Sequence, residues 1–166
     1  MPILINQKQY LPDFIRLNED WISHYFRIEE ADRELARNPA GIIDDGGYIF
    51  SLLEKEQVVG VCALFKEEDD VFQLARMAVS PETQRKGYGD ALMNAAFEHL
   101  HKIGASRVYL LSNTILAPAI ALYRKHGFTV LGEGQHPVYA RFNIVMEKLL
   151  YPPNPSFKQD ALKNAP

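Results

Sequence analysis

VSPETQRKGYGDAL, residues 79–92, runs from the end of a strand through a polar loop and two glycines into a helix. The first amides of a helix have no partners within the helix, and the helix dipole adds about half a positive charge there. Gly87 and Gly89 let a ligand approach the backbone closely, while Arg85 and Lys86 add side-chain charge. This stretch therefore predicts a site for an anion such as a diphosphate.

Two widespread phosphate-binding motifs do not fit this loop. A Walker loop needs Gly-Lys followed by Ser or Thr, whereas here the lysine precedes the glycine. The dinucleotide motif G-x-G-x-x-G needs a glycine where this loop has Leu92, and a second candidate at residues 132–137 ends in proline. A nucleotide-binding oxidoreductase is therefore disfavoured. The pattern that remains is Q-x-x-G-x-G, formed by Gln84, Gly87 and Gly89.

This remaining pattern resembles the pyrophosphate loop of the GNAT superfamily of acetyl-coenzyme-A-dependent N-acetyltransferases. A second segment, AIALYRKHGF at residues 119–128, is similar to a helix of that family that ends in Leu-Tyr-x-Lys-x-Gly-Phe. The family often has an asparagine seven residues before this tyrosine, where the chain has Leu116. Asn113, slightly upstream, is the expected substitute. The resemblance covers about residues 3–150.

The order of apolar and polar segments predicts a mixed α/β fold. Strands at 48–54, 58–65 and 71–79, separated by short turns, form an antiparallel meander, and the alternation of helix and strand that follows makes the sheet partly parallel. The resemblance implies a GNAT-like fold: a mixed, mostly antiparallel sheet of about seven strands flanked by about four helices, in the order β-α-α-β-β-β-α-β-α-β-β. The other expected elements are strands at 3–5, 107–111, 128–131 and 142–149 and helices at 13–22, 29–37, 87–103 and 117–126.

Length and composition limit the function further. The chain has 166 residues, and its 18 basic and 21 acidic side chains give a net charge of −3. Nucleic acids are bound through dense positive charge, so no nucleic-acid partner is expected. The longest apolar runs, such as Val58–Phe65, are strand-sized, so we expect no membrane partner and a cytoplasmic location. The prolines that follow the last strand predict one domain over residues 1–151 and a proline-rich tail over 152–166.

The resemblance implies that acetyl-coenzyme A is the co-substrate and that its pantetheine arm pairs with the strand before the loop. Pantetheine carries two amides, which an opened strand edge can hydrogen-bond as if they were another strand. A backbone amide beside a bulge would polarise the thioester carbonyl, and Arg76 and Met77 are best placed for this. Tyr88, between the two glycines, is expected to lie along the ligand. The expected cofactor contacts are Met77, Ala78, Val79, Gln84, Arg85, Lys86, Gly87, Tyr88, Gly89, Asp90, Asn113 and Tyr123.

Tyr123 is the catalytic residue that the resemblance implies, as the acid that protonates or hydrogen-bonds the departing thiolate. A core tyrosine is the alternative. No general base is named: Asp69, Asp70 and the Glu29–Glu30 pair are candidates acting through water, but carboxylates at turns and helix starts are usually solvated or act as caps. We expect neither a metal nor a covalent acyl-enzyme, because Cys62 lies in an apolar strand without an identified base.

The family's architecture places the acceptor between the first two helices and the loop that joins the last strands. This implicates Trp21, Tyr25, Tyr139 and Arg141. Arg141 is a candidate to grip an acceptor carboxylate bidentately, and an exposed strand residue is the alternative. The expected acceptor is a primary amine of a small molecule or peptide, and the resemblance allows a homodimer. A non-catalytic acetyl-coenzyme A or coenzyme A sensor on the same fold is the alternative function.

Overall fold

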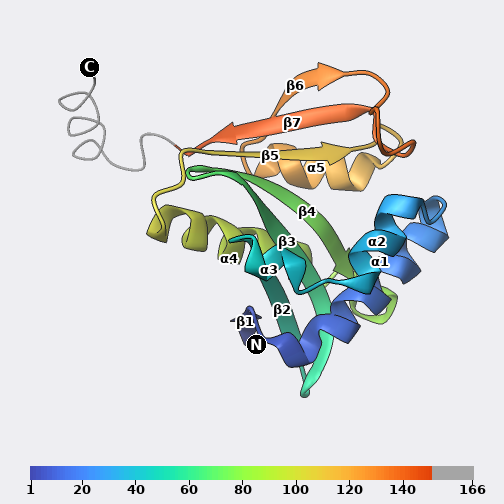
Figure 1. Ribbon diagram of the computed structural model, residues 1–166, viewed down its shortest axis with the longest axis vertical. Coiled ribbons are helices and arrows are strands. Elements are labelled where there is room, and N and C mark those ends of the chain that lie inside the picture. Colours follow the sequence, from blue (N-terminus) through green and yellow to red (C-terminus); the bar gives the residue numbers. More distant parts are fainter. Residues whose placement is uncertain (151–166) are drawn as a thin grey trace.

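A seven-stranded sheet with helices on both faces is the framework of the molecule (Figure 1). The computed structural model describes residues 1–150. The strand order is β1-β2-β3-β4-β5-β7-β6, and every neighbouring pair is antiparallel except β4 with β5. The strands are β1 Ile3–Ile5, β2 Tyr48–Glu54, β3 Gln57–Glu68, β4 Val71–Val79, β5 Arg107–Ser112, β6 Thr129–Glu133 and β7 Ile144–Leu149. The expected fold class is thus confirmed, while the predicted tail at 152–166 lies outside the described residues.

The helices agree with expectation except in one place. They are α1 Leu11–Tyr25, α2 Glu30–Arg37, α3 Gly41–Asp44, α4 Tyr88–Lys102 and α5 Ala117–Lys125, with short 3-10 turns η1 Lys8–Tyr10 and η2 Pro81–Thr83. No helix was predicted at α3. The single helical turn forms because the amide of Asp44 reaches the carbonyl of Ala40 and because Ile42 is buried in the core. Within residues 1–150, no helix combines the length and apolarity that crossing a bilayer requires.

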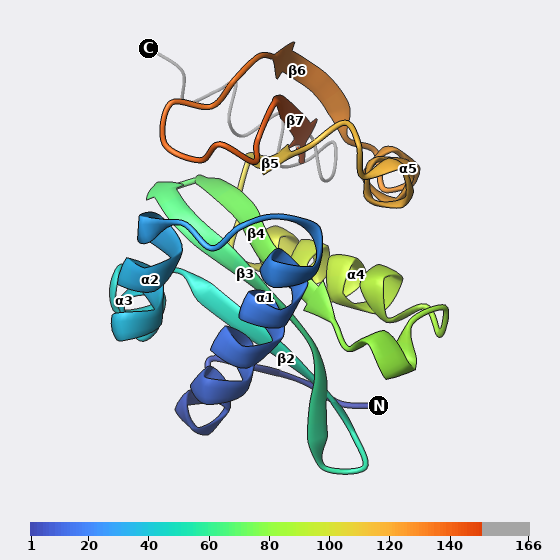
Figure 2. The same cartoon turned by 90° about the vertical axis from the view of Figure 1, so that its right-hand side faces the viewer.

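The sheet has a core on each face because helices cover both sides. In Figure 2, α2 and α3 lie to the left of strands β2–β4 and α4 lies to the right. Strand β2 alternates accordingly: Phe50 packs in the core with α4, and Ile49 packs in the core with α1. A strand buried on both faces is apolar at almost every position, which explains why residues 48–54 show no clear alternation of polar and apolar side chains.

Strands β4 and β5 pair only at one end and then separate. Their parallel register runs over Val71–Gln73 and Arg107–Tyr109, after which β4 bends away from β5 (Figure 1). The backbone of β4 beyond Gln73 therefore has an edge that β5 leaves unpaired.

A β-bulge lies on this open part of β4. Between the pairs Val61↔Ala78 and Ala63↔Ala75, β4 has two residues, Arg76 and Met77, opposite one residue of β3. Arg76 has a φ of 59°, in the left-handed region that a long side chain rarely adopts. The bulge thus occurs at the two residues that we expected beside it, and it turns the backbone locally out of the sheet.

Candidate active site

A cavity of about 350 Å³ occupies the space where β4 and β5 separate. One end is lined by Tyr123, which packs against the core that contains α4. The other end is lined by Trp21, which packs against the core that contains α1. The cavity therefore passes between the strands from one face of the sheet to the other, so that two ligands can enter from opposite sides and meet inside the sheet.

The loop before α4 and the first turn of that helix present a run of unpartnered backbone donors. The amides of residues 85–90 donate no hydrogen bond to any group within residues 1–150, and the next amide, of Ala91, bonds to the Gly87 carbonyl at 3.0 Å. Arg85 and Gly87 have positive φ values of 68° and 79°, which curve the loop around these donors. Successive free amides at a helix start form a concave site for phosphate oxygens. The loop therefore has the backbone geometry that an anion site requires.

The two glycines of this loop have different tasks. Gly87 is the left-handed residue that starts α4, and a side chain there would meet open space, so only its backbone conformation demands glycine. A Cβ on Gly89 would lie 3.2 Å from a methyl group of Leu122. Gly89 therefore allows α4 and α5 to approach each other, in addition to its free amide.

The side chain of Tyr88 does not lie along the loop as expected. It is buried in the core, and its hydroxyl donates to the carboxylate of Glu54. This hydrogen bond, together with burial and the carboxylate charge, raises the pKa of Tyr88 to about 12. Lys86 also faces Glu54, at 3.4 Å. Only the backbone of Tyr88 is left for a ligand.

Two other expected cofactor contacts have side chains with partners inside the protein. Asp90 accepts from Lys125 at 2.9 Å and contacts His126 at 2.7 Å, and these hydrogen bonds lower the pKa of the Asp90 carboxyl. Asp90 thus ties the start of α4 to the end of α5. Asn113 donates to the Arg141 carbonyl at 2.8 Å and accepts from the Ile115 amide at 3.0 Å. Asn113 lines the cavity, but its amide group is already engaged in holding the loop between β6 and β7.

Tyr123 is placed as a hydrogen-bond donor inside the cavity. Its ring packs edge-on against Phe128, and its hydroxyl makes no hydrogen bond to any group within residues 1–150. Burial, with a smaller effect from Cys62, raises the pKa of Tyr123 to about 12. The hydroxyl therefore keeps its proton at neutral pH and can donate it to an anion that forms nearby.

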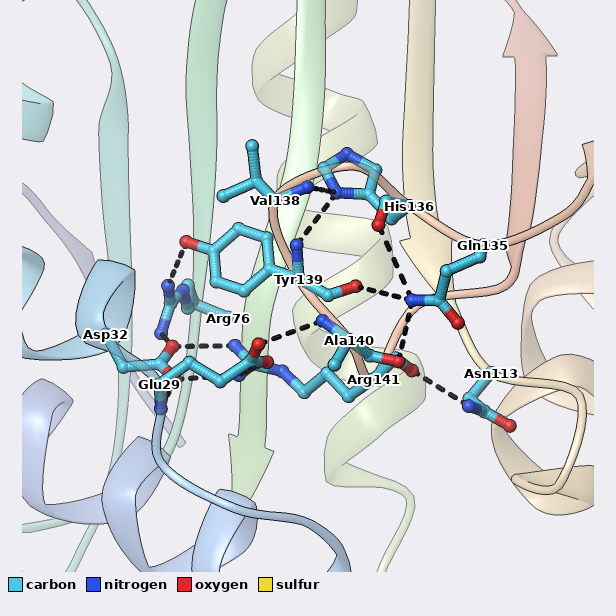
Figure 3. A network of polar contacts seen from close by, with 10 residues as sticks. All are labelled: Glu29, Asp32, Arg76, Asn113, Gln135, His136, Val138, Tyr139, Ala140 and Arg141. Atoms are coloured by element: carbon cyan, nitrogen blue, oxygen red, sulfur yellow. Dashed lines mark hydrogen bonds and ion pairs between the residues drawn. The ribbon is translucent and has the colours of Figure 1, made fainter.

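A buried ionic network closes the opposite side of the cavity (Figure 3). Asp32, whose side chain is 2% exposed, accepts from Arg76 at 2.7 Å and from two nitrogens of Arg141 at 2.7 and 2.6 Å. Arg76 donates a further bond to the Tyr139 hydroxyl at 2.8 Å, and Arg141 donates to Glu29 at 3.2 Å. We call these five residues the Asp32 network. It joins α2, the bulge of β4 and the β6–β7 loop.

The Asp32 network is electrically balanced and locally capped. Burial would raise the pKa of Asp32, but hydrogen bonds from Arg141 and the Glu29 amide, with the charges of both arginines, lower it below the ordinary value. Two arginines thus face two carboxylates, those of Asp32 and Glu29. The same two acidic residues form a capping box at the start of α2, which fixes their backbone.

This network corrects the expectation for Arg141. It is not an exposed strand residue: it is buried at 5% exposure in the loop before β7, and its guanidinium is already paired bidentately with Asp32. It also stacks on the rings of Tyr139 and Phe142, with its central carbon 4.6 and 4.9 Å from their centroids. A grip on an acceptor carboxylate would have to displace Asp32.

The remaining acceptor-side residues are divided between two hollows. Trp21 and Tyr139 line the cavity, whereas Tyr25 is 45% exposed and stacks on Trp21 with centroids 5.3 Å apart. Tyr25, Trp21 and Gln84 line a smaller hollow of about 180 Å³ between α1 and the loop before α4. Of the strand expected to hold pantetheine, Met77 lines the cavity, Val79 lines the smaller hollow and Ala78 is buried.

None of the four carboxylates considered as bases lines the cavity within the described residues. Asp69 faces Lys66 at an exposed turn, and Asp70 accepts from Ser106. Glu30 pairs with Arg33 and Arg37 on the surface, and Glu29 belongs to the Asp32 network. The amine proton therefore has no carboxylate acceptor among these residues in the cavity wall.

The fold agrees with what the chain is similar to. A family model described as "Acetyltransferase (GNAT) family" matches residues 12–128, and the chain belongs to this family. Among solved structures, a GNAT-family acetyltransferase from Staphylococcus aureus Mu50 superposes with a TM-score of 0.78 at 17% identity, over 90% of this chain and 99% of the other. A phosphinothricin acetyltransferase from Sinorhizobium meliloti, solved with acetyl-coenzyme A, gives 0.73 at 17% identity, over 89% and 87%.

Curated relatives are similar over shorter stretches. The chain is 33% identical over 82 residues to N-acetyltransferase family 8 member 3 of Rattus norvegicus, which is 46% of this chain and 36% of that protein. It is 27% identical over 121 residues to the mycothiol acetyltransferase of Corynebacterium glutamicum strain R, covering 73% of this chain and 38% of that protein. The chain thus spans between about a third and a half of the length of such relatives.

Proposed function

We propose that the chain is an N-acetyltransferase that transfers the acetyl group of acetyl-coenzyme A directly to a primary amine of a small-molecule or peptide acceptor, with both substrates bound together. The observation that carries this proposal is the continuity of the site. Six free amides at residues 85–90 lie in the loop before α4 and in its first turn, and the unpaired edge of β4 leads from that loop into the cavity lined by Tyr123.

Each part of the cofactor has a matching part of the protein. The free amides with Arg85 and Lys86 suit the pyrophosphate. The open backbone of β4 suits the pantetheine amides, because it lacks the partner strand that would otherwise use its donors and acceptors. The bulge at Arg76 and Met77 suits the thioester carbonyl, because it turns the backbone locally out of the sheet on the open part of β4. This order assigns Tyr123 to the sulfur end of the cofactor.

The proposed reaction is a single displacement. The acceptor nitrogen attacks the thioester carbonyl carbon, a backbone amide at the bulge stabilises the oxyanion, and the carbon–sulfur bond breaks. Tyr123 donates its proton to the departing thiolate, and water carries the proton lost by the amine back to the Tyr123 oxygen, so that the products are the acetylated amine and the coenzyme A thiol. A thiol relay is disfavoured, because Cys62 is fully buried and burial raises the pKa of its thiol. Most of the acceleration would come from holding amine and thioester together.

The test has a binding arm and a turnover arm. Saturating acetyl-coenzyme A should raise the melting temperature, while NAD, which also carries a pyrophosphate, should not, since the dinucleotide motif is absent. Thiol release with a panel of amines then separates an enzyme from a sensor: a stabilising cofactor without turnover would favour the sensor. If acetyl-coenzyme A did not raise the melting temperature, both the enzyme and the sensor hypotheses would be refuted. The cytoplasmic location and the homodimer stay predictions.

A further inference from the structure

The end of the cavity nearest α1 is walled mainly by rings. Its walls are half-buried side chains from α1 and the residue after it, from β3, β4 and β5, and from the β6–β7 loop. These are Trp21, Phe26, Phe65, Gln73, Tyr109 and Tyr139. Aromatic walls favour a flat apolar group, through the area they bury and through ring–ring contacts.

No charge in this wall is left for a ligand. None of the described residues that line the cavity is acidic, and its two arginines belong to the balanced Asp32 network. A ligand carrying a second ammonium would find no carboxylate in the lining itself, since Glu67 lies outside it and is hydrogen-bonded to Tyr109. A ligand carrying a carboxylate would compete with Asp32 for Arg76 or Arg141. Burying an unpaired charge in such a site raises the free energy of binding, whereas burying an aromatic ring lowers it.

Gln73 brings a polar group to this end. The amide of Gln73 makes no hydrogen bond to any group within residues 1–150, although the side chain is half-buried at the point where β4 leaves β5. The volume of about 350 Å³ is near the lower limit of ligand cavities, roughly 300–1,000 Å³, and it must also hold the thioester. A small molecule fits this space better than a peptide.

From these walls we infer that the acceptor is a small aralkylamine: one primary amine on a short linker to an aromatic ring, with no second charge. The inference rests on the proposed function and narrows it. The ring lies among the side chains of α1, β3 and the β6–β7 loop, and the amine points between β4 and β5 toward the bulge. Amino acids, polyamines and peptide N-termini are excluded by charge or size.

The experiment compares four amines with acetyl-coenzyme A by thiol release: 2-phenylethylamine, L-phenylalanine, cadaverine and spermidine. The value of kcat/KM for 2-phenylethylamine should exceed each of the others by at least about tenfold, because a buried unpaired charge is rejected strongly. Equal or better turnover of phenylalanine or spermidine would overturn the inference. In parallel, each amine is titrated by thermal shift into the protein saturated with coenzyme A. If no amine is turned over, the proposed transfer fails, and the ranking in this binding arm still decides the acceptor class.

A substitution of nearly the same shape makes the test sharper. Gln73→Glu places a carboxylate in the ring-lined end and should shift the cadaverine to 2-phenylethylamine ratio of kcat/KM toward cadaverine by about tenfold or more. Gln57→Glu makes the same chemical change at an exposed position at the start of β3 and should leave the ratio unchanged. If Gln73→Glu folds and the ratio does not move, Gln73 does not face the acceptor and the inference fails. If Gln73→Glu does not fold, the wild-type comparison of the four amines decides.

Discussion

Replacing Asp32 by asparagine removes one negative charge from the centre of the Asp32 network. The carboxylate accepts four hydrogen bonds, one from Arg76, two from Arg141 and one from the Glu29 amide at 2.8 Å. Asparagine has nearly the same shape but only one acceptor oxygen, and its NH₂ group would face a guanidinium donor. Glu29 alone would then balance two buried arginines.

The expected cost in the free energy of unfolding is about 3–5 kcal/mol, the range found when one partner of a buried ion pair is removed. Urea unfolding at pH 7 measures it. Glu30→Gln, two residues away on α2, is the matched control, because Glu30 pairs with Arg33 and Arg37 on the surface and such pairs contribute only about 0–1 kcal/mol. A loss for Asp32→Asn no larger than that for the control would refute the reasoning.

The pH dependence gives an independent check on the same charge. The folded protein lowers the pKa of Asp32 below its ordinary value of 3.8, so the carboxylate binds protons more readily in the unfolded chain. Its contribution to stability is therefore present above about pH 4 and is lost as the pH falls through the lower folded-state pKa. The difference between wild type and Asp32→Asn should be constant from pH 5 to 7 and shrink below about pH 4. A difference that grows on acidification would contradict this assignment.

Three further predictions concern the cofactor side. Tyr123→Phe should lower kcat by about tenfold to a hundredfold with little change in acetyl-coenzyme A affinity. The loss is limited because a thiol has a pKa near 8.5, so its thiolate can leave without a proton donor, although a donor speeds the step. An unchanged kcat would show that the hydroxyl takes no part in the mechanism. Gly87→Ala should destabilise the fold by about 1–2 kcal/mol and weaken cofactor binding, because its φ of 79° disfavours a Cβ; a calorimetric affinity equal to wild type would count against the loop geometry. Iodoacetamide should leave turnover unchanged, because Cys62 is buried and its thiol keeps its proton. Stoichiometric inactivation would instead support a mechanism in which the Cys62 thiol carries the acetyl group.

Local signals in the sequence predicted the strand, the loop and the helix start around residues 71–92. The glycine spacing, the charged residues before it and the strand at 71–79 are contiguous, and the physics of a helix start acts over a few residues. The strands at 48–54 and 71–79 match the structure at both ends. The side chain of Tyr88 was assigned wrongly because its partner, Glu54, lies 34 residues away and contiguous sequence does not show it.

The acceptor side depends on contacts between distant residues. Asp32 meets Arg76 over 44 positions and Arg141 over 109, and neither distance leaves a periodic signal. Glu29 followed three residues later by Asp32 does show a capping box, but such a box predicts only that a helix begins. Arg141 was therefore interpreted as a free cation, since its partner carboxylate lies on α2. Gln73 and His136, which also line the cavity, carry no motif at all.

The place of the Asp32 network follows from the opening in the sheet. Beyond Gln73 and Tyr109, β4 and β5 are no longer paired. The proposed cofactor binds in the gap between them. Arg76 lies on one side of the gap, on β4, and Arg141 precedes β7, which pairs with β5 on the other side. Asp32 binds both arginines and so connects the two sides of the gap by ionic contacts, where β4 and β5 make no backbone hydrogen bonds to each other (Figure 3).

The Asp32 network would therefore set the distance between the two sides of the cavity, and with it the distance between the bound amine and the thioester. Since misplacement by about 1 Å can cost on the order of a hundredfold in rate, Asp32→Asn should lower kcat at temperatures where the variant is still fully folded. The matched Glu30→Gln variant should keep its kcat, because its surface pairs touch neither wall. If the folded Asp32→Asn protein kept full kcat, the network would stabilise the fold without setting the spacing of the two substrates.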